Sequence, residues 1–333
     1  MKNKTFEKML MSAVFALTLA GCGSNASTTT EKASSNPSVS DTTKPASTFD
    51  TSKNIVCYTR DTTSGTRDGF FTKIGLSKNK ASNDGLVAGV VEASSNGNMI
   101  QSIKNDTYGI GYISLASLKD SGVKGLTYEN VEPSEANVLN GTYSLTRNFN
   151  YVYRNDYDST SKVKQIVEAF VAYTTTIEGK TIIKQKDGIL SLSNTDVSWN
   201  DIKANYSICN EDNSNITIRI GGSTSCEKIA TALTTAFSPL CGNFIASHNH
   251  TGSGDAYKHT QGAQKDDSGA LDIGFLSREL EDSEPAVEGT YGKICTDAIV
   301  AVVNEANPLT KTDADTLKAV YVGEKTLWKD IIA

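Results

Sequence analysis

The sequence lacks the excess of basic residues that non-specific nucleic-acid binders carry. Its 333 residues include 32 Lys and Arg against 38 Asp and Glu, which gives a formal net charge of −6. Non-specific binding to nucleic acid depends on a positive field, so this balance argues against that partner. The sequence also has no Cys-x-x-Cys pair, which is typical of zinc sites, and no Gly-x-Ser-x-Gly elbow, which presents the nucleophile of many hydrolases. We therefore expect no metal site, no cofactor and no enzymatic activity.

Histidine is scarce, and all its copies stand in one stretch, HNHTGSGDAYKH. They are His248, His250 and His259. His248 and His250 would share one face of a strand, and imidazole is a common metal ligand, but no carboxylate or cysteine stands close by at matching spacing. We expect an exposed loop beside Ser253, with a metal site as the alternative.

The first residues are typical of a targeting segment. Three lysines precede the apolar run Met9–Ala20, which is too short to span a bilayer comfortably. The run ends in LAGC, which resembles the bacterial lipobox, whose cysteine is diacylated and becomes the new N-terminus. We predict a lipoprotein signal peptide at residues 1–21 and lipidation at Cys22, which would anchor the protein at the extracytoplasmic face of a bacterial cell membrane. The alternative is an ordinary secretory signal followed by a chance cysteine.

A tether is expected between this anchor and the folded part. Residues 22–52 are rich in Ser, Thr, Asn and Lys and contain almost nothing apolar. Such a segment cannot bury enough surface to fold, so we predict a disordered link.

Five cysteines remain once Cys22 is set apart, and an odd number leaves at least one thiol unpaired. Cys226 and Cys241 are spaced to bridge across a helix, although the sequence does not fix that geometry. The simpler expectation is that most of the five are buried free thiols.

Two regions of the chain alternate apolar runs with helical patterns. They extend from about residue 53 to 195 and from about 215 to 333, and the polar, broken stretch 196–214 is typical of a linker. Tyr108–Leu115 is one such apolar run, and Ser161–Thr176 is an amphipathic helical stretch. Strands that alternate with helices predict an α/β fold with a largely parallel sheet, in which ligands bind beyond the carboxyl ends of strands.

Three stretches combine glycine with hydroxyl side chains at a turn before a helix. RDTTSGTR follows an expected strand and includes Arg60, GGSTS follows a second strand, and GSGDA surrounds Ser253. The commoner use of such a turn is to cap the helix. Together, however, neutral donors and one arginine are suited to a small, dehydrated oxyanion, whose charge they would spread over many hydrogen bonds.

These stretches belong to a larger set of motifs. The set resembles that of the phosphate-binding lipoprotein of bacterial phosphate ABC importers, the PstS type, over nearly all of residues 53–195 and 215–333. The motifs are RDTTSGTRDGFF, YGIGYISL, GTYSLTRNFNYVYR, GGSTS, GSGDA, LDIGFLSREL, CTDAIVAVVNEANPLTKT and VYVGEKTLWKDI. The resemblance implies a two-lobed periplasmic-binding-protein fold of type II, with mixed sheets flanked by helices. It also implies a monomer that captures inorganic phosphate between its lobes and delivers it to a permease driven by an ATPase.

The order of the motifs departs from the family pattern. In the family the GSTS half comes first, whereas this chain starts at SGTR and ends at LWKDIIA. The resemblance therefore implies a circular permutant, whose old termini are joined by residues 196–214 and whose new ends lie close together. One lobe would comprise residues 53–113 plus 304–333 and carry the SGTR motif. The other lobe, residues 114–303, would carry the GSTS and DIG motifs. The alternative is a truncated or misassembled gene with two unrelated half-domains.

The resemblance also implies which residues bind the phosphate. Carried over residue by residue, they are Thr224, Ser225, Ser253, Ser277, Arg60, Ser64, Gly65 and Thr66. Arg60 would be the only full positive charge on the anion, and the others would donate backbone or hydroxyl hydrogens. We expect Arg67 and Arg147 to be salt-bridge or lobe-surface residues.

Ser277 marks a second departure from the family. Many members have an aspartate at this position, which accepts a proton from bound phosphate and so helps to reject sulfate. Ser277 also accepts a hydrogen bond, but it tolerates a fully deprotonated anion without charge repulsion. Asp61 and Asp272 are the nearby acids that would have to compensate. Two alternatives follow, namely a receptor of the same fold for sulfate or molybdate, and a surface adhesion or sensing module that has lost transport.

Overall fold

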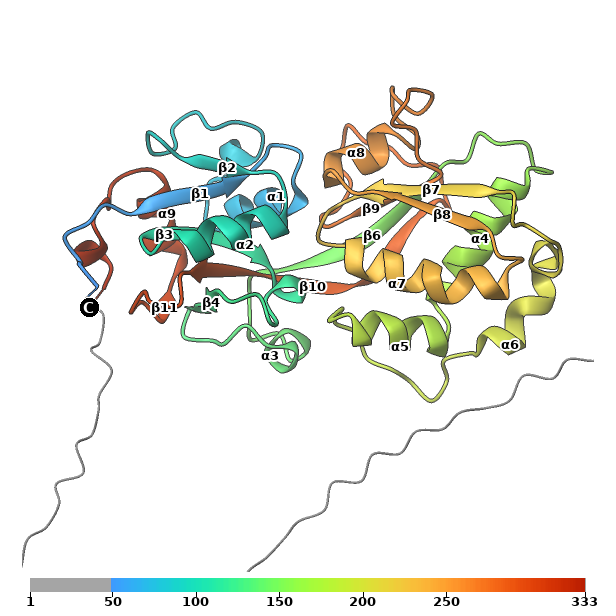
Figure 1. Ribbon diagram of the computed structural model, residues 1–333, viewed down its shortest axis with the longest axis horizontal. Helices are drawn as coiled ribbons and strands as arrows, with labels where there is room; N and C mark the ends of the chain where they lie inside the picture. The colour runs from blue at the N-terminus through green and yellow to red at the C-terminus, as the bar shows by residue number, and fades with distance from the viewer. Residues whose placement is uncertain (1–48, 333) are drawn as a thin grey trace, which may run out of the picture. The chain divides into compact units, whose positions relative to one another are not determined.

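The computed structural model describes residues 49–332 (Figure 1). The predicted signal peptide, the predicted lipidation site at Cys22 and most of the predicted tether lie outside the described residues. Phe49 packs against Tyr108 and Trp328, with ring centroids 5.0 and 5.5 Å apart. The folded part therefore begins before residue 52, the predicted end of the tether. Within the described range, none of the helices combines the length and hydrophobicity that a membrane span requires.

One sheet of nine strands forms the centre of the fold. In chain order, the strands of the described part are β1 (Val56–Arg60), β2 (Val91–Ala93), β3 (Gly109–Ser114), β4 (Lys124–Gly125), β5 (Thr127–Tyr128), β6 (Thr146–Tyr153), β7 (Thr217–Gly222), β8 (Ile245–Asn249), β9 (Ile273–Leu276), β10 (Tyr291–Val303) and β11 (Lys311–Thr312). The order in the sheet is β2-β1-β3-β10-β6-β9-β7-β8, with β4 paired to β10, while β11 and β5 form a separate pair. β10 is antiparallel to both β3 and β6. The sheet is therefore mixed, as the family resemblance implies, and not largely parallel.

Several helices begin where a polar side chain caps the free backbone amides. The helices of the described part are α1 (Gly65–Lys73), α2 (Asn96–Asn105), α3 (Glu135–Leu139), α4 (Lys162–Thr174), α5 (Ile177–Gln185), α6 (Trp199–Ile202), α7 (Glu227–Phe237), α8 (Ser253–Lys258) and α9 (Ala314–Tyr321). Ser64, Ser95 and Ser161 each accept a hydrogen bond from an amide in the first turn of α1, α2 and α4. Such an oxygen replaces the partner that the first N–H groups of a helix lack, so the sequence fixes these starts locally.

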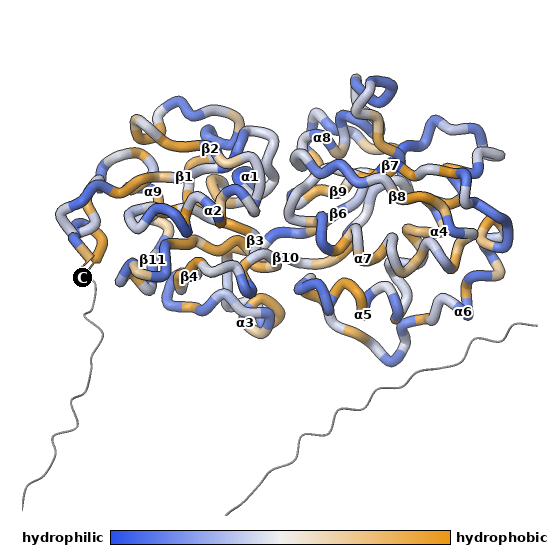
Figure 2. Tube along the Cα trace, in the orientation of Figure 1, coloured by the Kyte–Doolittle hydropathy of each residue, from blue (hydrophilic) through white to orange (hydrophobic). Residues whose placement is uncertain are grey.

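The two largest of four hydrophobic clusters form the cores of two lobes in the described chain. The core of the first lobe contains Phe70 and Tyr112, and that of the second lobe contains Phe170 and Phe237. β10 takes part in both lobes, because its first part pairs with β6 and its last part pairs with β3 (Figure 1). Figure 2 shows hydrophobic residues along β3 inside the first lobe and a hydrophilic loop after α8.

The chain passes from one lobe to the other at positions that differ from the predicted ones. The chain packs in the first core up to Leu145, and Phe149 already belongs to the second core, although Ile189 later contributes to the first core again. On the return, Cys295 belongs to the second core and Ala298 to the first. The expected second lobe, 114–303, therefore starts too early and ends too late. The physical reason is that β6 and β10 are continuous strands at the junction of the lobes, so no break in the sequence marks the crossing.

The predicted linker 196–214 is packed against the second lobe. Its Trp199 and Ile208 are both buried in the second core. The indole of Trp199 makes an edge contact with Phe237, with ring centroids 5.1 Å apart. The linker is polar overall, but these two apolar side chains hold it against the second lobe.

The cysteine pairing differs from the suggested one. Cys241 forms a disulfide with Cys209 of the linker, across 32 residues of sequence. The suggested bridge between Cys226 and Cys241 is therefore wrong. Cys57, Cys226 and Cys295 are buried free thiols, as we expect for most of the five. Burial raises the pKa of Cys57 to about 12, so this thiol stays protonated at neutral pH.

The two ends of the folded part meet in the first lobe. Asn54 and Leu327 form an antiparallel bridge, and the amide of Ile55 donates to the carbonyl of Thr326 at 2.7 Å. The two halves of the sequence also share one sheet, because β10 from the second half lies between β3 and β6 from the first. The alternative of two unrelated half-domains is therefore wrong. Adjacent ends are what a permuted domain requires.

Candidate anion-binding site

The SGTR turn joins β1 to α1 in the first lobe. Arg60 is the last residue of β1, and Gly65 is the first residue of α1. Between them, Ser64 caps the helix, because its Oγ accepts hydrogen bonds from the amides of Thr66 and Arg67 at 3.2 and 3.3 Å. The N-terminus of α1, with its partial positive charge, thus stands directly after a buried guanidinium.

The GSTS turn joins β7 to α7 in the second lobe. Gly222 ends β7 with φ of 96°, and a β-carbon there would collide with the carbonyl oxygen of Phe275. Only glycine fits this conformation and this space. The chain can therefore turn sharply and present Ser223, Thr224 and Ser225 just before α7.

The two turns meet where the lobes meet. Thr66 Oγ1 of the first lobe lies 3.0 Å from Ser225 Oγ of the second. Arg60 Nη2 lies 3.4 Å from Thr224 Oγ1. All four side chains are predicted anion ligands, and the tertiary structure brings them together from opposite halves of the sequence.

Ser253 and Ser277 extend this cluster in the second lobe. Ser253 begins α8, and Ser277 follows β9. Their Oγ atoms are 3.2 Å apart, and the amide of Ser277 donates to Ser253 Oγ at 2.9 Å. Gly65 faces both, since a β-carbon at Gly65 would stand 2.6 Å from Ser277 Oγ and still closer to Ser253 Oγ. The other seven predicted ligands therefore form one cluster, and Ser64 stands next to it as the cap of α1.

Arg60 is the charged donor of this cluster, and its residue is only 1% exposed. Its Nε donates to the carbonyl of Ala93 at 2.9 Å, and its Nη2 donates to Asp61 and to the carbonyl of Ser94. Its Nη1 is buried and has no hydrogen-bond partner among the described residues. Burial lowers the pKa of Arg60, and the adjacent Asp61 carboxylate opposes this shift. A buried cationic donor without a partner fits an anion at this position.

Two side chains from outside the three glycine-containing turns contact the predicted ligands, and the sequence did not indicate either as part of the site. Arg147 donates to Ser225 Oγ at 3.0 Å and to Ser277 Oγ at 3.2 Å, and it forms an ion pair with Asp297 at 2.9 Å. The expected salt bridge is therefore present, but Arg147 is not a surface residue, because its side chain is 4% exposed. Arg60 is thus not the only cation beside these hydroxyls. A lone arginine in the otherwise apolar alternation of β6 was the available signal.

Asn96 is the second missed side chain. It is the first residue of α2, and its Nδ2 donates to Ser225 Oγ at 3.0 Å and to Thr224 Oγ1 at 3.4 Å. Its Oδ1 accepts a hydrogen bond from the amide of Ser114 at 3.1 Å, which fixes the orientation of the amide group. Asn96 therefore ties the first lobe to the GSTS turn of the second. No pattern in the sequence distinguishes it from an ordinary residue at a helix start.

Asp61 and Asp272 are the acids that would have to compensate for the missing aspartate, and only one of them lies near the predicted ligands. Asp272 stands just before β9, at the opposite end of that strand from Ser277, and forms an ion pair with Arg219 at 2.6 Å. It therefore cannot compensate at the cluster. Asp61 lies beside Arg60, with 3.2 Å between Oδ2 and Nη2, and is the acid near the predicted ligands.

The histidines next to the GSTS turn form a chain of hydrogen bonds. His250 Nδ1 donates to the carbonyl of Ser223 at 3.0 Å, and His248 Nδ1 therefore donates to His250 Nε2 at 3.2 Å. Burial lowers the pKa of both to about 4. His248 is part of β8, so the expected exposed loop is wrong for these half-buried rings. Over residues 49–332, no group of three or more His, Cys, Asp or Glu side chains is arranged to hold a metal ion.

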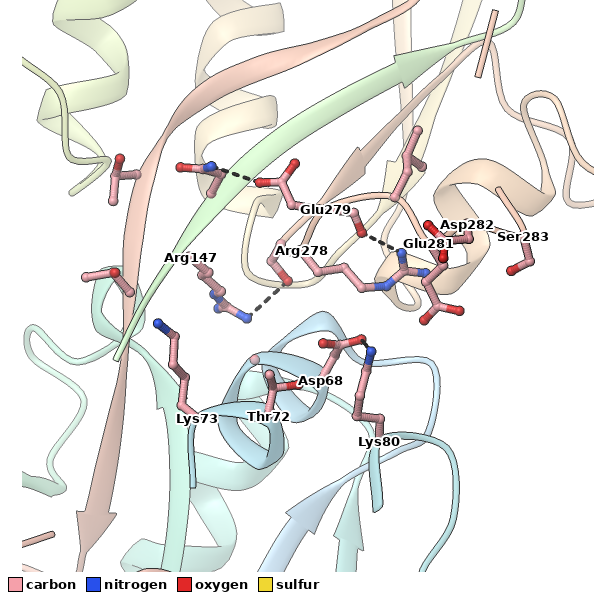
Figure 3. Close-up of a pocket in the computed structure, with 16 residues that line it drawn as sticks. Asp68, Thr72, Lys73, Lys80, Arg147, Arg278, Glu279, Glu281, Asp282 and Ser283 are labelled. Atoms are coloured by element: carbon pink, nitrogen blue, oxygen red, sulfur yellow. Dashed lines mark hydrogen bonds and ion pairs between the residues drawn. The ribbon is translucent and has the colours of Figure 1, made fainter. Parts of the chain in front are cut away.

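A cavity of about 780 Å³ adjoins the cluster and shares Arg147 and Ser277 with it. Figure 3 shows that it lies between α1, which contributes Asp68 and Lys73, and the segment after β9, which contributes Arg278. Charges of both signs line the cavity, so its walls do not select an anion by net charge. Any selection depends on the hydroxyl and guanidinium cluster.

The comparisons with known proteins agree with this architecture. The model of the PBP superfamily domain matches residues 210–333. The phosphate-binding protein PstS 2 of Streptococcus agalactiae serotype V is 26% identical, over 84% of this chain and 87% of the relative. PstS 2 of Streptococcus pneumoniae serotype 4 is 27% identical, over 98% of this chain and 99% of the relative. A solved phosphate-binding protein of a phosphate ABC transporter from S. pneumoniae TIGR4 has 24% identity and a TM-score of 0.59, over 84% of this chain and 100% of the solved one.

The chain resembles the PstS-type phosphate-binding proteins along most of its length. The resemblance found in the motifs is thereby confirmed, and so is the periplasmic-binding-protein fold. The alignment with the S. pneumoniae relative spans nearly all of both chains. A circular permutation relative to other members of the family stays a prediction.

Proposed function

We propose that the protein is a solute-binding protein of an ABC importer that captures inorganic phosphate between its two lobes. Its relatives are named for phosphate binding. The observation in this chain that carries the proposal is the side chain of Arg60, whose Nη1 is buried without a partner among the described residues and whose Nη2 lies 3.4 Å from Thr224 Oγ1 of the opposite lobe. A tetrahedral oxyanion accepts hydrogen bonds on all sides, which suits a cluster of hydroxyls around a guanidinium.

Lobe closure gives this arrangement its mechanism. The first lobe supplies Arg60 and Thr66, and the second supplies Thr224, Ser225 and Ser253. The two sets of donors surround one point only when the lobes are together, so a bound anion favours the closed form over the open one. β6 and β10 connect the lobes and are the segments about which a hinge movement would occur.

The proposal extends to delivery and location. The closed protein presents phosphate to a permease and its ATPase at the extracytoplasmic face of the membrane. It acts as a monomer anchored by lipid at Cys22, without a cofactor and without catalysis. Its site residues are Arg60, Ser64, Gly65, Thr66, Thr224, Ser225, Ser253 and Ser277. Its lobes are those defined by the two hydrophobic cores.

Isothermal titration of the full chain with phosphate, and separately with sulfate, at neutral pH tests the proposal. We expect micromolar or tighter phosphate binding, since many charge-assisted hydrogen bonds converge on one small anion. Absence of heat with phosphate from a folded sample would overturn the proposal. Lipidation is tested separately, by mass spectrometry of the chain and of a Cys22→Ala variant expressed in a bacterium.

A second candidate function is a receptor of the same fold for sulfate or molybdate. It is favoured by Ser277, which stands where a carboxylate would repel a fully deprotonated anion, and by the distance of Asp272 from the cluster. Sulfate binding as tight as phosphate binding in the same titration would support this candidate.

A further inference from the structure

Arg147 is bonded in a way that a simple ion pair does not require. Its Nε and Nη2 both lie 2.9 Å from Asp297 Oδ2, which would satisfy a structural salt bridge. The same guanidinium also reaches two hydroxyls of the second lobe, with Nη2 3.0 Å from Ser225 Oγ and Nη1 3.2 Å from Ser277 Oγ. Both hydroxyls belong to the proposed site, and the outer edge of the guanidinium therefore faces the proposed ligand.

The two buried arginines approach the same turn from different elements. Arg60 at the end of β1 reaches Thr224, and Arg147 in β6 reaches the next residue, Ser225. Two guanidinium groups that converge in a buried place repel each other unless an anion lies between them. The nearby Arg147 cation adds to the lowering of the pKa of Arg60 that burial causes.

Each of the two arginines has a carboxylate partner, Asp61 beside Arg60 Nη2 and Asp297 beside Arg147. Asp297 holds the Nε edge of Arg147 and also accepts a hydrogen bond from Ser114 Oγ at 2.9 Å. Asp297 is fully buried on β10, so Arg147 is held in a fixed orientation between the two strands that connect the lobes. An arginine fork held at one edge has its remaining N–H groups pre-organised for a planar or tetrahedral oxyanion.

We infer that Arg147 is a second guanidinium ligand of the anion, so that Arg60 and Arg147 together bind a doubly charged tetrahedral oxyanion. The inference rests on the proposed function. It names the ligand class more closely, as the dianion of phosphate in preference to its monoanion. Arg147 also lines the adjoining cavity, so an arriving anion meets it from that side (Figure 3).

The test is phosphate titration of the full chain and of Arg147→Gln, below and above the second ionisation of phosphate. We expect binding that is roughly thirty- to hundredfold weaker in the variant, the loss typical of a buried charged donor. We also expect the affinity of the variant to rise less with pH, because one cation favours the dianion less than two do. Arg147→Lys, which keeps the charge and loses the fork, should fall between the two.

Two further variants separate an effect on phosphate binding from an effect on folding. Arg147→Gln leaves Asp297 buried without its partner, so the double variant Arg147→Gln/Asp297→Asn removes both charges and should fold if the single variant does not. Arg278→Gln is the matched control, because Arg278 lines the same cavity but is paired with Glu284 at 2.6 Å and not with the cluster. We expect its phosphate binding to stay within about twofold of the unsubstituted chain, since a residue away from the bound ion changes binding little.

The outcomes distinguish the proposed phosphate-binding function from the inferred role of Arg147. If the unsubstituted chain does not bind phosphate, the proposed function is wrong and the inference is wrong with it. If the unsubstituted chain binds phosphate, and folded Arg147→Gln or the double variant binds it equally well with the same pH dependence, only the inference is overturned. Weaker binding with a flatter pH dependence in a folded variant, against an unchanged Arg278→Gln, supports it.

Discussion

Ser277 Oγ lies 2.6 Å from the point where a β-carbon on Gly65 would stand. Gly65 begins α1 in the first lobe and Ser277 follows β9 in the second, so the two lobes touch at a place that has no room for a methyl group. The closeness of this contact makes Gly65 a position where lobe closure can be tested by a single substitution.

Gly65→Ala should weaken phosphate binding by about tenfold or more, because the added methyl keeps the lobes apart while the helical conformation itself accepts alanine. Titration measures the affinity, and small-angle scattering with phosphate present measures whether the variant still compacts. Gly97→Ala in α2 is the control, because its β-carbon would meet its nearest neighbour, Ser95 Oγ, at an ordinary 3.7 Å. Equal binding by Gly65→Ala and Gly97→Ala would contradict closure at this contact.

Arg60→Ala should weaken phosphate binding by about a hundredfold or more, since it removes the unpartnered cationic donor from the proposed site. The free energy of unfolding without phosphate should change much less than the free energy of phosphate binding. Arg154→Ala is a control, because Arg154 is paired with Asp156 and Asp266 away from the cluster. An unchanged dissociation constant in folded Arg60→Ala would remove Arg60 from the site.

Ser277→Asp should shift the site towards phosphate over sulfate, because a carboxylate accepts the proton of hydrogen phosphate and repels sulfate. Competition between the two ions on one sample measures the ratio of affinities, which we expect to rise about tenfold or more. Ser277→Asn introduces a side chain of nearly the same size as aspartate but without its charge. It should leave the ratio closer to that of the unsubstituted chain. If both variants give the same ratio, charge at this position does not set the selectivity.

The His248–His250 pair should make the fold less stable in acid. Burial lowers the pKa of each ring from 6.5 to about 4, the neighbouring His250 lowers that of His248 further, and Glu227 opposes that shift. Since the unfolded chain takes up these protons at a higher pH than the folded one, their contribution is complete above pH 6.5 and is lost as the pH falls towards about 4. We expect a loss of about 2–3 kcal/mol, reduced from the full linkage value because the two rings are only partly buried.

Chemical denaturation across this pH window measures the loss. The double variant His248→Gln/His250→Gln keeps polar groups of similar size and should give a flatter curve between the two pKa values. A curve as steep as that of the unsubstituted chain would assign the acid sensitivity to other groups.

The parts of the site that follow from local chemistry could be predicted. Gly222 must turn sharply after β7, Ser64 must cap α1, and both act through atoms a few residues away. The motif around Arg60 likewise places the guanidinium at the end of a strand before a helix. Such features depend on neighbouring residues and survive in any fold that keeps the strand–turn–helix element.

The parts that could not be predicted depend on partners far apart in the chain. Arg147 is paired with Asp297, 150 residues away, and Cys209 with Cys241 across 32 residues. Local sequence favoured Cys226 as a partner because spacing was the only guide. The crossing points between lobes were misplaced for the same reason, since β10 runs as one strand through both lobes.

The sequence by itself determined the elements of this protein, the donor-rich turns and the family resemblance, because propensity, capping and turn chemistry are short-range effects. Only the tertiary structure decided that the turns of the two halves face one another, that Arg147 and Asn96 join them, and that Asp272 does not. Those outcomes depend on how two cores pack against one shared sheet. Packing selects among many pairings that the sequence alone leaves equivalent.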